Sequence, residues 1–115
     1  MKPSKTMMSM AWLAVPVALT FGATAASATD ADAAQALARA QNCFKCHSVE
    51  KKKDGPSFKE TAAKYKGKAD AVDKVVHHLT SGEKAKFPDG HEEDQKVVKR
   101  DPAEIKNLAE WILAQ

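Results

Sequence analysis

The chain has 115 residues, a formal net charge of +3 and only two cysteines. Residues 1–28 hold two of its 18 basic residues and none of its 15 acidic ones, so the remaining chain carries a net charge of +1. This near balance argues against a nucleic-acid-binding protein, for which a strongly basic surface is typical. The length allows one domain, and a core of this size usually needs a disulfide, a metal or a cofactor for stability.

The N-terminal segment, residues 1–28, has the parts of a secretory signal peptide. A start with two lysines is followed by an apolar stretch from Met10 to about Ala23 and then by the small residues Ala-Ser-Ala. The apolar stretch is shorter than the ~20 residues that a helix needs to cross a bilayer. We therefore predict export with cleavage after Ala28, no stable membrane insertion afterwards, and a single domain at residues 29–115. An uncleaved membrane anchor is the alternative.

The first two predicted helices lie at about residues 31–42 and 57–65. The first is rich in alanine, which favours helix, and Thr29 or Asp30 is placed to cap it. The second begins with the capping-box spacing Ser57–Glu60, in which each residue caps a backbone N–H group of the other.

The third and fourth helices are predicted at about residues 69–80 and 102–114. Gly82 is placed to end the third. The fourth begins with a second capping box, Asp101–Glu104, and has proline at its first position. Its apolar residues recur at helical spacing; they are Ile105, Leu108, Ile112 and Leu113, with Trp111 beside them.

The connection at residues 82–100 is polar, and no part of the chain alternates as a strand would. We therefore predict an all-α fold. A connection of this length in so small a domain is uncommon unless it has a function.

The run Cys43-Phe44-Lys45-Cys46-His47 is the most specific feature of the chain. Cys-x-x-Cys-His is the attachment signature of a c-type haem. Two thiols three positions apart can reach the two vinyl groups of one porphyrin edge, and the next residue, His47, then points its imidazole at the iron. We predict one haem c, bound covalently through Cys43 and Cys46, with His47 as an iron ligand.

Three other readings of the two cysteines are weaker. A thioredoxin-like Cys-x-x-Cys needs a strand-helix context that the chain lacks. A zinc site needs a second closely spaced ligand pair, and His77 and His78 are a poor one because adjacent helical residues point about 100° apart. A disulfide within the motif would close a very small loop and stabilise the fold little.

The mature chain resembles a small class I c-type cytochrome of the bacterial periplasmic kind. The resemblance rests on the attachment motif, on Gly55-Pro56, on the segment Ala-Ala-Lys-Tyr-Lys-Gly at 62–67 and on the closing helix Leu-Ala-Glu-Trp-Ile-Leu-Ala-Gln. It implies about four helices wrapped around one covalently bound haem, in the periplasm.

The resemblance also implies contacts around the haem. Cys43 and Cys46 carry the thioether bonds, and the Pro56 carbonyl should accept the second imidazole N–H of His47, which orients the ring. The terminal helix should cross the first helix near Ala36, Leu37 and Ala40, with Trp111 as a core residue.

The sixth iron ligand is the main departure from the family pattern. In this family it is usually a methionine in the loop before the last helix, whereas the four methionines of this chain all lie in residues 1–10. His91 is close to the expected position, and we predict it as the second metal ligand, giving bis-histidine ligation. His78, on the flank of the third helix, Lys86, or a water or open site are the alternatives.

These features predict a monomeric electron carrier between redox proteins, without enzymatic activity. Lys45 and the lysines at 51–53 could surround the haem edge and steer acidic partners, or simply keep the surface soluble. A ligand-binding or sensor haem protein with an open or labile sixth site is the main alternative, and an electron-entry subunit detached from a larger complex is another.

Overall fold

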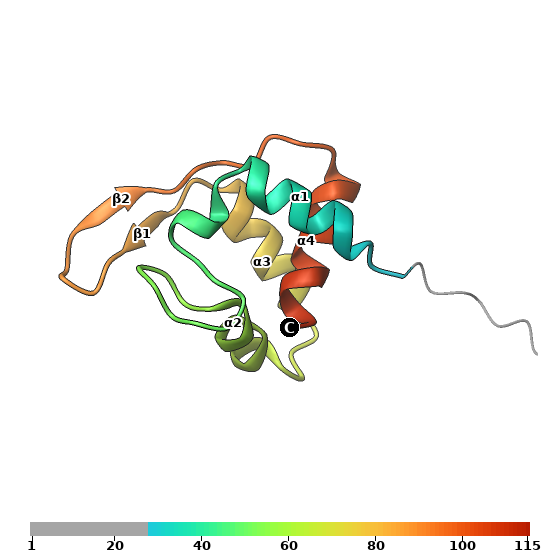
Figure 1. Cartoon of the computed structure of the whole chain (residues 1–115), viewed down its shortest axis with the longest axis horizontal. Coiled ribbons are helices and arrows are strands. Elements are labelled where there is room, and N and C mark those ends of the chain that lie inside the picture. The colour runs from blue at the N-terminus through green and yellow to red at the C-terminus, as the bar shows by residue number, and fades with distance from the viewer. Residues whose placement is uncertain (1–27) are drawn as a thin grey trace, which may run out of the picture.

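The computed structural model describes residues 28–115, so the predicted signal peptide lies outside the described residues apart from its last position. Four α-helices and one short 3-10 helix, η1, make up about half of the described chain (Figure 1). In chain order they are α1 (Ala31–Ala40), η1 (Cys43–Lys45), α2 (Phe58–Tyr65), α3 (Ala71–Thr80) and α4 (Pro102–Leu113). Within this part of the chain, no helix is both long and apolar enough to span a membrane.

The helix starts follow the capping signals in the sequence. Asp30 caps α1 by accepting a hydrogen bond from the Ala33 N–H. Both predicted capping boxes form: Ser57 and Glu60 at the start of α2, and Asp101 and Glu104 at the start of α4. These local contacts satisfy N–H groups that have no partner within the helix, and they fix where each helix begins.

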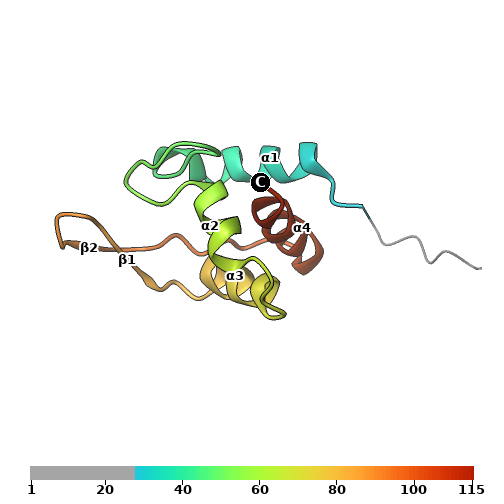
Figure 2. The ribbon, with the colours of Figure 1, turned by 90° about the horizontal axis from the view of Figure 1, so that it is seen from below.

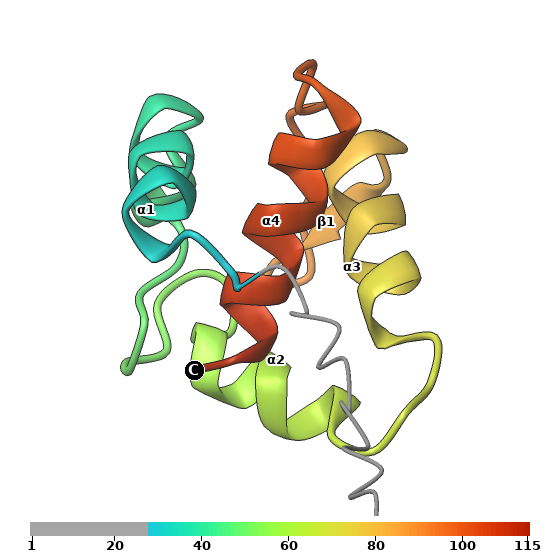
Figure 3. The ribbon, with the colours of Figure 1, turned by 90° about the vertical axis from the view of Figure 1, so that its right-hand side faces the viewer.

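Helix α4 is the centre of the fold. It packs against α1, α2 and α3, and Figure 3 shows it between α1 and α3 with α2 across one end. Leu108 and Ala109 at its middle are completely buried. Asn107 also holds the start of α1, because its side chain accepts a hydrogen bond from the Asp30 N–H and donates one to the Asp30 carbonyl, each at 2.8 Å.

The residues that α1 buries differ from the prediction. Leu37 is buried as expected, but the small buried residues are Ala34 and Ala38, whereas Ala36 and Ala40 are exposed. Ala34, Leu37 and Ala38 lie three and four positions apart and therefore share one helix face.

The prediction that the chain contains no strand is wrong. Residues Lys84–Lys86 (β1) and Glu92–Asp94 (β2) form an antiparallel hairpin, which projects beyond the helices (Figure 1 and Figure 2). Lys84 pairs with Asp94 at 2.6 Å and Lys86 with Glu92 at 3.7 Å across the two strands. Neither face of the hairpin is buried, so its strands lack alternating apolar residues. Pairs of opposite charge stabilise the two strands instead, and the sequence therefore has no hydrophobic pattern that would predict them.

Candidate haem-binding site

The attachment motif forms one tight turn at the end of α1. Asn42 adopts the left-handed conformation, with φ of 59°, which asparagine tolerates better than most residues. The N–H groups of Cys46 and His47 then both donate to the Cys43 carbonyl, at 3.2 and 2.9 Å. The turn thus places both thiols and the imidazole on one short segment, as attachment to a single porphyrin edge requires.

His47 is oriented by a backbone carbonyl. Its Nδ1–H donates to the Pro56 carbonyl at 2.7 Å, which confirms the predicted contact. This hydrogen bond holds the proton on Nδ1 and leaves the lone pair of Nε2 available to a metal, and it makes the imidazole a stronger ligand.

Gly55 packs directly against the face of the His47 ring. A Cβ atom at Gly55 would lie 2.5 Å from Cε1 and 2.8 Å from Nδ1 of His47, which is closer than real Cβ contacts. The Gly55 N–H also donates to the Cys46 carbonyl at 2.8 Å. Glycine is needed here because of this close approach, and the contact restricts movement of the ring.

Aromatic side chains connect the His47 ring to the core. Phe58, at the start of α2, is stacked with His47 at a centroid distance of 5.6 Å and an interplanar angle of 24°. Trp111 and Phe44 meet Phe58 edge to face, at 5.5 and 5.9 Å. Phe58 and Trp111 are both buried, so the ring of His47 rests on a rigid part of the hydrophobic core.

His91 lies at the tip of the hairpin, away from the attachment turn. Its ring is stacked on Phe87 at 4.2 Å, its Nδ1 contacts the Asp89 carboxylate, and its Nε2 is 3.4 Å from Glu93. The hydrogen bond to Asp89 raises the pKa of His91, and Glu93 adds to the rise. Among residues 28–115, no hydrogen bond, ion pair or ring contact joins His91 to His47.

His78 lies near the end of α3. Its Nε2 is 2.7 Å from the Gln95 side-chain nitrogen, and its Nδ1 is 3.8 Å from Glu83. Burial lowers the pKa of His78, Glu83 opposes this shift, and His47 adds to the lowering. The side chains of His78 and His91 are both 47% exposed, but burial is the main cause of the pKa shift only at His78.

Comparison with known proteins supports the same interpretation as the geometry. The family profile described as "Cytochrome c" matches residues 31–115. The chain belongs to the cytochrome c family.

Its relatives are small class I cytochromes of bacteria. The cytochrome is 38% identical to cytochrome c-551 of Pseudomonas denitrificans over 67% of this chain and 90% of that protein. It is 35% identical to cytochrome c-552 of Nitrosomonas europaea over 92% of this chain and 97% of that protein. Among solved structures, the class 1 cytochrome MtoD from Sideroxydans lithotrophicus ES-1 is 64% identical, with a TM-score of 0.74 over 76% of this chain and 97% of that one.

The cytochrome carries one haem c, bound covalently through its Cys-x-x-Cys-His motif. The residues present fit this group: Cys43 and Cys46 are unbridged and partly exposed, and His47 is already oriented by Pro56. Burial raises the pKa of the Cys43 thiol. The fold is the mostly helical class I cytochrome c fold, as predicted.

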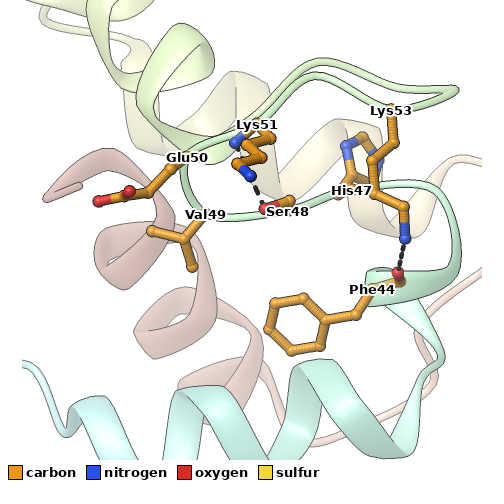
Figure 4. Close-up of a pocket in the computed structure, with 7 residues that line it drawn as sticks. All are labelled: Phe44, His47, Ser48, Val49, Glu50, Lys51 and Lys53. Carbon is orange, nitrogen blue, oxygen red and sulfur yellow. Dashed lines mark hydrogen bonds between the residues drawn. The ribbon is translucent and has the colours of Figure 1, made fainter.

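A hollow of about 450 Å³ lies beside the attachment turn. Phe44 and Val49 provide its apolar surface, and Lys51 and Lys53 lie at its edge (Figure 4). Lys53 also donates from Nζ to the Phe44 carbonyl at 2.7 Å. Sequence analysis missed this contact and the contact of Gly55 with His47, although the short spacing from Cys46-His47 to Gly55-Pro56 indicates a loop that folds back on the motif.

Proposed function

We propose that this cytochrome is a periplasmic electron carrier whose iron is held by His47 and His91, exported by a signal peptide at residues 1–28 and active as a monomer at residues 29–115. The observation that carries the proposal is the orientation of His47: one ring nitrogen is bound to Pro56 at 2.7 Å and the other is left for the iron.

The contacts of His91 support its role as the sixth ligand. The Asp89 carboxylate accepts a hydrogen bond from the Nδ1–H of His91 and a second one from the His91 backbone N–H at 3.1 Å. A carboxylate on one ring nitrogen is a common arrangement for a metal-bound histidine, because it orients the ring and leaves Nε2 for the metal. Ligation then requires the hairpin to bring His91 to the iron and Nε2 to leave Glu93.

His78 is the main competitor. Its Nε2 is engaged by Gln95, and the Gln95 side-chain oxygen is buried without a hydrogen-bond partner among the described residues. Binding of His78 to iron through Nε2 would break this contact and leave more of the Gln95 amide unpaired, which costs free energy. Binding of His91 to iron would not break a contact with a buried neutral side chain.

The bound haem supplies a one-electron Fe(III)/Fe(II) couple. The role of the protein is to hold His47 in one orientation, so that little rearrangement accompanies electron transfer. The ring is held by the hydrogen bond to Pro56 and by its contacts with Gly55 and Phe58. A second imidazole in place of methionine lowers the redox potential, within the ~0.8 V range that axial ligands can set.

The expected partners are redox proteins with acidic docking surfaces. Lys45, Lys51 and Lys52 are exposed and close in sequence to the attachment motif, where the haem edge would be reached. Such charges raise the rate of encounter with an oppositely charged surface, and salt screens this effect. The rate of electron transfer to an acidic partner should therefore fall as the ionic strength rises.

The experiment compares His91→Ala with His78→Ala in the haem-loaded protein. Near-infrared and EPR spectra of the oxidised wild-type protein should report two histidine ligands. His91→Ala should convert the low-spin spectrum to high-spin, whereas His78→Ala should leave it low-spin. The opposite pattern would transfer the ligand role to His78, and no change in either variant would remove both histidines from the iron.

A ligand-binding or sensor haem protein is the second candidate, because His91 lies on an exposed hairpin and both its ring nitrogens contact carboxylates. Carbon monoxide distinguishes the two functions. A carrier with two firm ligands should bind it slowly or not at all at neutral pH, and rapid, complete binding to the reduced wild-type protein would favour the sensor.

A further inference from the structure

The Lys53 side chain is fixed at the attachment turn. Lys53 lies in the loop that follows the motif, nine residues after Phe44, and its Nζ donates to the Phe44 carbonyl at 2.7 Å. Figure 4 shows Lys53 extending past His47 to reach Phe44. The ammonium group is therefore held on the carbonyl of a residue that lies between the two cysteines in sequence, and the Lys53 side chain runs beside His47 (Figure 4).

The Phe44 carbonyl is available because of the geometry of the turn. The N–H groups of Cys46 and His47 both donate to the Cys43 carbonyl instead. A carbonyl at the end of a helical turn without a backbone donor is a favourable partner for a lysine ammonium. The Lys53 backbone is held as well, since its N–H donates to the Gly55 carbonyl at 3.1 Å.

The charge of Lys53 has no ion-pair partner in the described part of the chain, although Asp54 follows it in sequence. Within residues 28–115, none of the ion pairs includes Lys53, whereas the neighbouring acid Glu50 is paired with Lys59 at 2.7 Å. Lys52, the adjacent residue, carries the same charge; both lysines are exposed, but among those residues only the Lys53 side chain makes a hydrogen bond to the turn. Lys53, which is bonded to the turn, and Lys52, which is not, are therefore adjacent in sequence and can be compared directly.

We propose that Lys53 helps to set the redox potential: its fixed positive charge beside the attachment turn stabilises the reduced haem. Reduction adds one electron, supplied by a redox partner, and makes the iron less positive by one unit. A nearby positive charge repels Fe(III) more than Fe(II), so it favours the reduced form and raises the midpoint potential. The inference rests on the proposed electron-carrier function but not on which residue is the sixth ligand.

The test measures the midpoint potential of haem-loaded Lys53→Met, with Lys52→Met as the matched control. Methionine keeps most of the apolar stem and removes the charge. Lys53→Met should favour the oxidised form at least twofold, which is a fall of about 18 mV or more for one electron. Lys52→Met should shift the potential less. The difference between the two variants should shrink in ~1 M salt, because both lysines are exposed and salt screens exposed charges.

Two further measurements test whether the Lys53 charge and its contact with the turn cause this shift. Lys53→Arg, which retains the charge and can donate to the same carbonyl, should restore the wild-type potential. In the haem-loaded wild-type protein, acylation followed by mass spectrometry should modify Lys53 more slowly than Lys52. Equal shifts for Lys53→Met and Lys52→Met, or equal acylation rates, would overturn the proposal. Failure of the carrier function would appear differently, as rapid carbon monoxide binding or an irreversible couple in the wild-type protein.

Discussion

Substituting Gly55 by alanine tests how tightly the fold holds its iron ligand. The added Cβ would lie 2.5 Å from Cε1 and 2.8 Å from Nδ1 of His47, so either the ring or the loop must move. Movement of the ring by a few tenths of an ångström would lengthen the 2.7 Å hydrogen bond from Nδ1 to Pro56. The backbone at Gly55 is not in the left-handed region, so the effect is a steric one.

The expected loss of stability can be worked out from three contributions. Crowding in a packed site costs about 1–3 kcal/mol. Weakening the hydrogen bond to Pro56 costs about 1 kcal/mol. Replacing glycine by alanine stiffens the unfolded chain and returns about 0.4–1 kcal/mol. We therefore expect Gly55→Ala to reduce the free energy of unfolding by about 2 kcal/mol.

Denaturant unfolding of the haem-loaded protein, followed by the Soret band, measures this loss. EPR of the oxidised protein should show altered g values, because the His47 ring is displaced. Gly67→Ala is the matched control: its φ of +76° makes alanine strained, but a Cβ there meets no atom within 4 Å. It should cost stability without changing the EPR spectrum. If Gly55→Ala had wild-type stability and an unchanged EPR spectrum, the conclusion that only glycine fits against the His47 ring would be refuted.

Three further predictions concern the fold and its pH dependence. Leu108→Ala, at a fully buried position of α4, should cost about 2–5 kcal/mol in denaturant unfolding, and a cost near that of a surface substitution would contradict the central role of α4. Ser57→Ala removes one half of the α2 capping box and should cost about 1 kcal/mol; Ser57→Thr, whose hydroxyl can still accept a hydrogen bond from the Glu60 N–H without burying a charge at this position, should restore part of it, and equal losses would argue against capping. Burial lowers the pKa of His78 in the folded protein, so the unfolded chain binds a proton at a higher pH than the folded protein does. The free energy of unfolding should therefore fall as the pH drops below about 6.5 toward the folded pKa. His78→Gln should flatten this part of a pH–stability curve, and an unchanged slope would show that His78 does not cause it.

Much of this protein follows from local sequence. The capping boxes at Ser57 and Asp101 form as predicted because each involves groups within three residues, which meet whenever the helix begins there. The attachment motif predicts the haem for a similar reason, since its two thiols and imidazole are placed by one turn of backbone. The absence of methionine after position 10 raises the question of the sixth ligand without any structure.

Other features depend on contacts between distant segments. The charged strands of the hairpin are stabilised by each other rather than by the core, so the sequence has no apolar alternation to reveal them. Helical spacing places several alanines of α1 where they could face α4, and only packing of the two helices decides that Ala34 and Ala38 are buried. The close approach of Gly55 to His47 and the reach of Lys53 to Phe44 require the loop to fold back on the turn. Short-range hydrogen bonding thus determined where the helices and the cofactor motif lie, whereas steric fit between remote segments decided what surrounds them.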